Sequence, residues 1–189
     1  KQAWIRELYE DNGESVLSFV GRFNLKSSPE KVALDILERL QINPSEYSNA
    51  GPVREWIGKA EMAGIFISRT SFIHSKLKLD SEELQGFAVA DIYAPFVFIN
   101  SEDWEAPQLF TLVHELAHIW IAASGVSNEI DPDMKHKEKG HPVERFCNEV
   151  AAHALMPSTL VKQLDAVLFN SYRDGLKMSR KLGVSCFAL

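Results

Sequence analysis

Two histidines and a glutamate are spaced as in a metal site on one helix, in the segment His114-Glu115-Leu116-Ala117-His118. Residues four apart lie one helical turn apart on the same face, so both imidazoles can reach one zinc ion at about 2.0–2.1 Å. Glu115 lies between them, where a carboxylate can accept the proton of a water whose pKa zinc lowers to about 7. The motif therefore predicts zinc-dependent hydrolysis.

The segment that carries the motif is strongly apolar. Its apolar members are Phe110, Leu112, Val113, Leu116, Ala117, Ile119, Trp120 and Ile121. Polar groups without partners would be costly to bury on such a helix, so we expect the motif to line a functional site. The alternative is a half-buried helix whose polar residues fall by chance on a solvent-facing stripe.

A catalytic zinc site needs a third protein ligand and an open fourth position. The short spacing of metzincins would put this ligand at position 124, which is a serine, so that class is excluded. Later donors fall in a polar stretch and in the helix expected after it. They are Glu129, Asp131, Asp133, His136, Glu138 and His141 in the stretch, and Glu144, Cys147, Glu149 and His153 in the helix. A loop positions a ligand poorly, which favours the helix.

Within that helix, the spacing favours Glu144. It shares one face with residues at i+4, i+7 and i+11, namely Asn148, Ala151 and Leu155. Glu149 and His153 lie about 140° and 180° away, as is typical of a solvated face. Two alternatives stay open: Glu144 as an acidic residue favoured by the helix dipole, and a Cys147 thiolate as the donor.

The elements that must position these residues can be placed from sequence patterns. We expect buried strands near residues 65–67, 86–90 and 96–99, and a mobile loop from Ser124 to His141. Helices are expected over parts of 1–20 and near 29–40, 53–63, 107–121, 142–155, 158–168 and 173–182. Helices, a small sheet and further helices in this order predict an α+β fold. We divide the chain into an N-terminal helical segment, 1–48, and a larger domain, 49–189.

Composition limits the classes of protein that fit. Of the 189 residues, 46% are hydrophobic and 24% are charged, which fits a globular protein and excludes a collagen-like or disordered chain. The net charge of −6 does not favour nucleic-acid binding, and Cys147 and Cys186 are too few for a disulfide framework. The longest nearly apolar stretch, 110–123, is too short to cross a membrane. Because the sequence lacks an initial Met and ends without a helix stop signal, we expect a longer parent protein, truncated at its C-terminus.

Two longer stretches carry a family resemblance. The first is Phe110-Thr111-Leu112-Val113-His114-Glu115-Leu116-Ala117-His118, and the second is Glu144-x-x-Cys147-Asn148-x-x-Ala151-Ala152-x-x-Leu155-Met156-Pro157. Together they resemble the ImmA/IrrE family of metallo-endopeptidases. The strand pair near residues 86–100 and the segment 182–185 are also similar, so the likeness covers roughly residues 50 to 189. Cys147, Val150 and Ala154 depart from the residues usual in the family, at positions where the helix packs.

The resemblance implies a zincin-like fold of the gluzincin type, with a small, mostly antiparallel sheet, a zinc helix and a following ligand helix. It implies that His114, His118 and Glu144 bind Zn²⁺ and that Glu115 is the catalytic base. Members of the family are bacterial or phage-borne, act in the cytoplasm and cleave a partner helix-turn-helix repressor. The resemblance therefore implies a protein substrate, no membrane association and no direct nucleic-acid binding by this part of the chain. Many members are fused to a DNA-binding domain, which a longer parent protein would accommodate.

The alternative function is a non-catalytic zinc-binding regulatory module that binds a repressor or antitoxin. The intact Glu115 favours the enzyme, because a binding module needs no base. A zinc hydrolase of small molecules is a third reading, for which no pocket is defined by the sequence. Tyr93 and His141 are candidates to stabilise the oxyanion. An exposed edge of the sheet is expected to pair with the substrate.

Overall fold

The structure is a computed structural model that describes residues 2–74, 77–80, 84–123, 125–127, 142–164 and 172–185. Its helices are α1 (Gln2–Asp11), α2 (Pro29–Leu40), α3 (Pro52–Met62), α4 (Glu105–Trp120), α5 (Pro142–Leu155), α6 (Ser158–Leu164) and α7 (Tyr172–Leu182). Its strands are β1 (Phe66–Arg69), β2 (Phe72–His74), β3 (Leu77–Lys78), β4 (Gly86–Val89), β5 (Phe96–Ile99) and β6 (Gly125–Ser127). The fold is α+β, as predicted.

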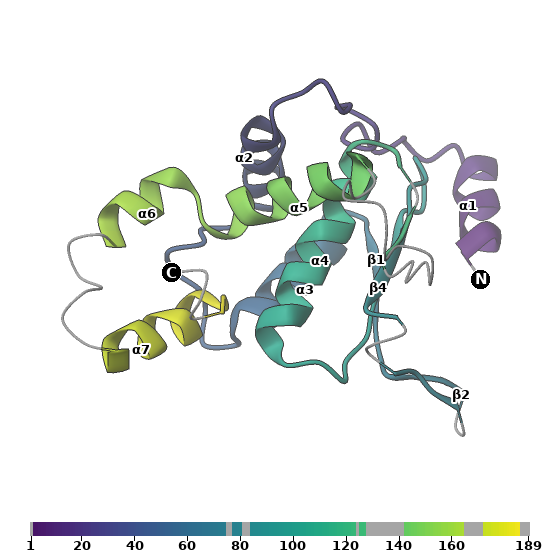
Figure 1. Cartoon of the computed structure of the whole chain (residues 1–189). Coiled ribbons are helices and arrows are strands. Elements are labelled where there is room, and N and C mark those ends of the chain that lie inside the picture. The colour runs from purple at the N-terminus through teal and green to yellow at the C-terminus, as the bar shows by residue number, and fades with distance from the viewer. Residues whose placement is uncertain are drawn as a thin grey trace, which may run out of the picture.

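The main sheet is small and mixed, with four strands in the order β1-β5-β4-β6. Strands β1 and β5 are parallel, whereas β4 is antiparallel to both of its neighbours. The antiparallel hairpin of β2 and β3 extends away from the rest of the molecule (Figure 1). The three expected strands correspond to β1, β4 and β5.

The prediction of one mobile loop from Ser124 to His141 is wrong for residues 125–127. These residues form β6, which pairs with β4 from Gly86↔Ser127 to Ala88↔Gly125. Strand β6 is three residues long, too short to show the alternation that marks a strand in a sequence, and its partner is far away in the chain. The rest of the stretch lies outside the described residues.

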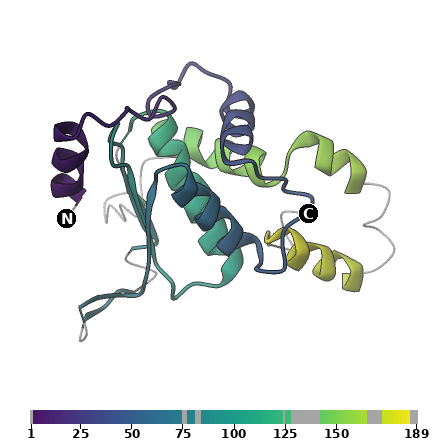
Figure 2. The same ribbon diagram turned by 180° about the vertical axis from the view of Figure 1, so that it is seen from behind.

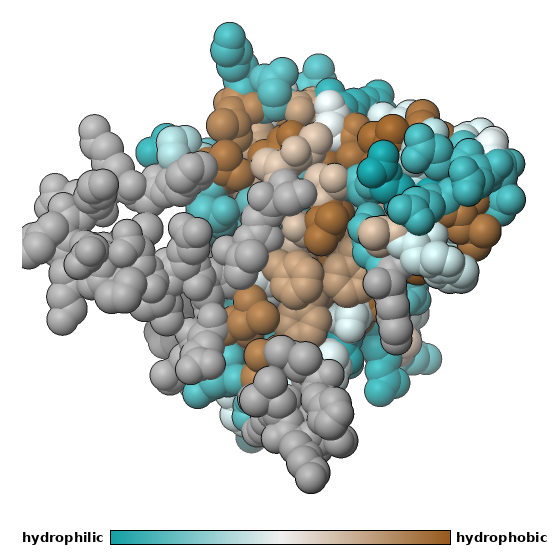
Figure 3. Space-filling view, turned by 90° about the vertical axis from the view of Figure 1, so that its right-hand side faces the viewer, coloured by the Kyte–Doolittle hydropathy of each residue, from teal (hydrophilic) through white to brown (hydrophobic). Residues whose placement is uncertain are grey.

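The two faces of the sheet differ because side chains alternate along each strand. Ala88, Val97 and Ile99 point towards α4 and belong to the hydrophobic core. On the other face, the ring of Phe87 contacts those of Phe96 and Phe98, with centroid distances of 5.8 and 5.3 Å. Apolar side chains gather at the centre of this face (Figure 3). Both faces of the central strands are therefore apolar.

Helix α4 is the centre of the molecule. It lies along the sheet, with α3 and α5 packed against it (Figures 1 and 2). Twelve of its sixteen residues are buried, including both histidines and the glutamate of the motif. Among its apolar residues, Ala106, Pro107 and Phe110 are not buried, and 37% of Phe110 is exposed. The motif is thus held on a largely buried helix.

Helix α2 shares the core of α4 and α5. Its buried residues are Val32, Ala33, Ile36, Leu37 and Leu40. The indole Nε1 of Trp120 in α4 also donates a hydrogen bond to Asp35 of α2, at 2.9 Å. Helix α1 differs, because none of its residues is buried. The division of the chain near residue 48 stays a prediction.

Within the described residues, no helix combines the length and the apolar character that a membrane span requires.

Candidate metal site

Helices α4 and α5 bring three of the predicted residues together. His114 and His118 come from α4, and Glu144 comes from the first turn of α5. One ligand atom from each of the three lies within 4.8 Å of the other two. The two helices run antiparallel here. His118 contacts Glu144 at the start of α5, whereas His114, earlier in α4, also contacts Asn148, one turn further along α5.

The contacting atoms are the ones a metal would use. The Nε2 of His114 lies 3.0 Å from one carboxylate oxygen of Glu144, and the Nε2 of His118 lies 3.3 Å from the other. The two Nε2 atoms are 3.1 Å apart. Glu144 keeps 37% of its side chain exposed, whereas the imidazoles are nearly fully buried. The cluster therefore opens to the solvent on the side of Glu144.

The other nitrogen of each imidazole is held by the protein. The Nδ1 of His114 lies 2.9 Å from Oδ1 of Asn148, and the Nδ1 of His118 lies 2.9 Å from the backbone carbonyl of Ala123. Both partners are acceptors, so each Nδ1 carries a hydrogen and donates it. This fixes the ring orientation and directs each Nε2 towards the cluster, as in histidines that bind metals.

The sequence reasoning did not assign a role to Asn148 or Ala123. Asn148 follows Glu144 by one turn, so this spacing is the signal that could have found it. The carbonyl of Ala123 carried no such signal, because every residue has one.

The ionisable groups of the cluster shift one another's pKa values. Hydrogen bonds with His114 and His118 hold the pKa of Glu144 well below its ordinary value. Burial acts to lower the pKa of His118, but its contacts with Cys147 and Glu144 outweigh this effect and raise the pKa to about 10. Without a metal, a proton on His118 thus stabilises the carboxylate beside it. A divalent cation would take the place of that proton.

Glu115, on α4, is fully buried where the helix packs against the start of β4. Its Cγ lies 3.4 Å from the position that a Cβ would occupy on Gly86. Its charge also acts to raise the pKa of His118. A buried carboxylate beside the candidate ligands is suitably placed for proton transfer.

Other predicted donors lie elsewhere. Cys147 is buried beside His118, and burial raises the pKa of its thiol, which disfavours the thiolate that a metal needs. The side chain of Glu149 is 53% exposed and lies 3.6 Å from Arg145. His153 is exposed. Glu129, Asp131, Asp133, His136, Glu138 and His141 lie outside the described residues.

Tyr93, one candidate for oxyanion stabilisation, lines a different cavity. Ile5 and Tyr9 of α1 line the same cavity, together with Phe66 and Phe96 of the sheet. The structure therefore does not bring Tyr93 to the cluster of His114, His118 and Glu144.

The donor set fits a divalent metal. Two imidazole nitrogens and a carboxylate converge, and both imidazoles have their outer nitrogens satisfied by acceptors. Neutral imidazoles and a carboxylate are acceptors at the point where they meet, and such a group is stabilised by a cation. His114, His118 and Glu144 are the residues that could hold it.

A comparison of sequences identifies the family of the chain. The model of the Peptidase_M78 family, the IrrE N-terminal-like domain, matches residues 60–189. The chain belongs to this family. No curated protein matches the chain. Membership of this peptidase family, with a cluster that could bind a metal, indicates a function of the metallopeptidase type.

Proposed function

We propose that the chain is a zinc-dependent endopeptidase of the zincin type. In this proposal His114, His118 and Glu144 bind zinc, and Glu115 is the general base. One observation carries the proposal: the two Nε2 atoms and the Glu144 carboxylate converge within 4.8 Å while Asn148 and Ala123 hold the opposite nitrogens. Two histidines and a glutamate are also the ligands of known catalytic zinc sites in peptidases.

The residues of the chain have separate tasks in peptide hydrolysis. When bound, zinc supplies a Lewis acid and lowers the pKa of water. Glu115 accepts a proton from the attacking water and then donates it to the nitrogen of the leaving amine, so the carboxylate is regenerated. Asn148 and the carbonyl of Ala123 keep the imidazoles oriented throughout. Burial of Glu115 excludes bulk water from this proton transfer.

We further propose that the substrate is a helix-turn-helix repressor, cleaved at one site in the cytoplasm. The resemblance of the two helical motifs to the ImmA/IrrE family supports this choice. A cytoplasmic protease of broad specificity would damage its own cell, so the reaction requires a selective substrate. The alternative is a regulatory module that binds a repressor without cleaving it. Such a module would not need Glu115 as a general base.

Metal analysis tests the ligands first. We expect one zinc per chain, and we expect Glu144→Ala to lose it while Glu149→Ala, on another face of the same helix and exposed, keeps it. Loss of zinc in Glu149→Ala, but not in Glu144→Ala, would assign the ligand role to Glu149.

Incubation with candidate repressors, with and without a chelator, then tests the activity. We expect cleavage by the zinc-loaded chain, none after chelation, and none by Glu115→Gln, which keeps zinc. Cleavage at the normal rate by Glu115→Gln would show that Glu115 is not the base. Binding of a repressor with no cleavage by the unmodified chain would favour the regulatory module.

A further inference from the structure

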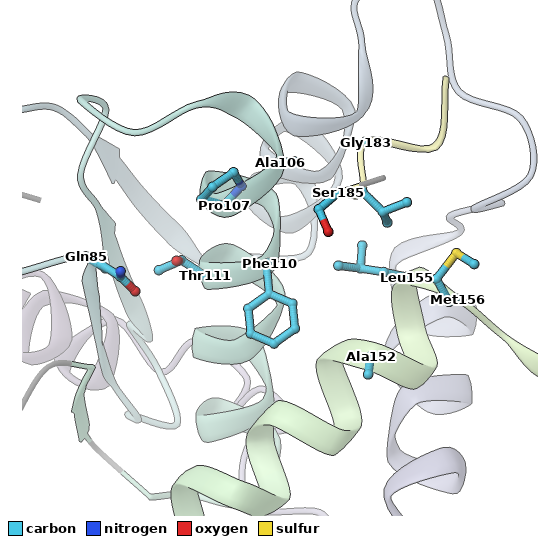
Figure 4. Close-up of a pocket in the computed structure, with 11 residues that line it drawn as sticks. Gln85, Ala106, Pro107, Phe110, Thr111, Ala152, Leu155, Met156, Gly183 and Ser185 are labelled. Atoms are coloured by element: carbon cyan, nitrogen blue, oxygen red, sulfur yellow. The ribbon is translucent and has the colours of Figure 1, made fainter. Parts of the chain in front are cut away.

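An apolar cavity of about 420 Å³ lies between α4 and α5. It lies between the first half of α4, the last turns of α5 and the segment 183–185 (Figure 4). Its apolar lining includes Phe110 on α4, Ala152 and Leu155 on α5, and Met156 directly after α5. A volume of this size falls within the range of pockets that bind small ligands or large side chains.

Two of the residues that line the cavity lie one helical turn from residues of the metal cluster. Phe110 precedes His114 by one helical turn, and their ring centroids are 6.5 Å apart. On α5, Ala152 follows Asn148 by one turn, and Asn148 contacts His114. One turn of helix rises about 5.4 Å, close to the reach of a leucine or phenylalanine side chain from its backbone. A side chain next to a peptide bond at the cluster would therefore end in the cavity.

The lining also selects the kind of side chain. Among the described residues that line the cavity none is charged, and the polar ones are Gln85, Thr111 and Ser185. A charged side chain would lose its hydration there without gaining an ionic partner. A large apolar side chain would instead be removed from water by Phe110, Leu155 and Met156.

We propose that this cavity binds a large apolar side chain of the substrate, on the residue next to the cleaved bond, and so determines where the chain cleaves. The inference rests on the proposed endopeptidase function and adds the class of residue that the site selects. Ala152 is the residue that controls the size of the cavity, because its small exposed side chain leaves the space beside Phe110 open.

Binding of hydroxamates tests the inference without requiring cleavage. A hydroxamate group binds zinc, and a series can carry no side chain, an isobutyl, a benzyl or a carboxymethyl group in place of the substrate side chain. On the zinc-loaded chain, calorimetry should show the isobutyl and benzyl compounds binding about tenfold to a hundredfold more tightly than the unsubstituted one. The carboxymethyl compound should bind no more tightly than the unsubstituted one.

Two substitutions on α5 form a matched pair. Ala152→Phe fills the cavity, whereas His153→Phe adds the same side chain at the next position, which is exposed and does not line the cavity. We expect Ala152→Phe to abolish the preference for isobutyl and benzyl groups, and His153→Phe to retain it. Zinc content should be unchanged in both variants.

The results separate the two proposals. Equal affinity for all four compounds, or a preference that Ala152→Phe leaves intact, would overturn the assignment of the cavity while the metal site stands. Failure of every hydroxamate to bind a chain that holds zinc would overturn the proposed function itself, and the cavity assignment with it. A preference for the carboxymethyl compound would also overturn the assignment, because it requires a cation at the cavity.

Discussion

The two imidazoles of the cluster depend on partners that do not touch the metal position. Asn148 accepts a hydrogen bond from His114 across 34 residues of sequence, and the Ala123 carbonyl does the same for His118. Such partners commonly change metal affinity by about 10- to 100-fold when they are removed. The side chain of Asn148 is therefore a positioning group for one ligand.

We expect Asn148→Ala to weaken zinc binding by about 10- to 100-fold and to leave the fold intact. The measurement is competition for zinc against a chromophoric chelator, with thermal unfolding of the metal-free proteins as the check on folding. Glu149→Ala is the control, since it changes the next residue of the same helix, whose side chain contacts Arg145 and not a histidine of the cluster. Equal zinc affinity of Asn148→Ala and the unmodified chain would remove this role from Asn148.

Zinc binding should also release a proton at neutral pH. In the metal-free chain the pKa of His118 is about 10, as contacts with Cys147 and Glu144 outweigh burial, so His118 is protonated at pH 7. A ligand imidazole must be neutral, so affinity rises with pH below about 10. Calorimetry at pH 7 in buffers of different ionisation enthalpy should show about one proton released per zinc.

A heat of binding that does not depend on the buffer would contradict this prediction. Glu144→Asp provides the comparison, because it keeps the charge but shortens the side chain that holds His118. An NMR titration of the metal-free chain should independently show His118 retaining its proton well above its ordinary pKa of 6.5.

The residues of the motif could be predicted from the sequence because their geometry is local. His114 and His118 are one turn apart in any helix, and Glu115 directly follows His114 in the sequence. The choice of Glu144 over Glu149 needed only the helical period and the family resemblance. The spacing places Asn148 on the same face as Glu144, but its hydrogen bond with His114 and the opening of the cluster beside Glu144 depend on how α5 crosses α4.

At the scale of elements, the contact of β4 with α4 places Glu115. Gly86 begins β4, and a Cβ there would lie 2.6 Å from Cγ2 of Thr111, 2.9 Å from the carbonyl oxygen of Phe98 and 3.4 Å from Cγ of Glu115. The missing side chain thus allows the strand to lie directly on the helix at the proposed base. No sequence pattern showed this, since the approach joins residues of two separate elements.

We expect Gly86→Ala to lower the free energy of unfolding by about 1–3 kcal/mol, because the added methyl group overpacks this contact. Chemical denaturation measures the loss. Adding Thr111→Ser removes the nearest methyl group and should restore part of the stability. Gly58→Ala is the matched control: nothing lies within 4 Å of its added Cβ, and within α3 alanine should stabilise by about 0.5–1 kcal/mol. Equal effects of the two alanines would contradict the close contact.

The sheet shows which elements a sequence can predict. Strands β4 and β5 were found from their apolar residues, because both carry apolar side chains on both faces, although one face of β4 is only partly buried. Strand β6 was missed, since it is a three-residue segment whose structure depends on pairing with β4. Hydrogen bonds to another strand are a tertiary property, and no local pattern encodes them.

At the scale of the whole molecule, α2 joins the N-terminal segment to the core behind the metal cluster. Four of its larger side chains, Val32, Ile36, Leu37 and Leu40, are at most 8% exposed. Burial of each is worth about 1.5–3 kcal/mol, so together they contribute about 6–12 kcal/mol. This is comparable to the entire stability of a typical domain, about 5–15 kcal/mol. Helix α1, with no buried residue, contributes far less.

Two truncations of the chain should therefore behave differently. Removal of residues 1–14 deletes α1 and should leave cooperative thermal unfolding and zinc binding, because Phe19 and α2 stay in place. Removal of residues 1–48 exposes the surfaces of α4 and α5 that α2 covers, and takes away the acceptor of the Trp120 hydrogen bond. We expect this shorter chain to lose cooperative unfolding, as measured by calorimetry and by near-ultraviolet circular dichroism.

Ile36→Ala in the full chain tests the same contact without truncation and should lower the free energy of unfolding by about 2–5 kcal/mol. Cooperative unfolding of residues 49–189 with unchanged stability would instead show that the larger domain folds independently of the N-terminal segment.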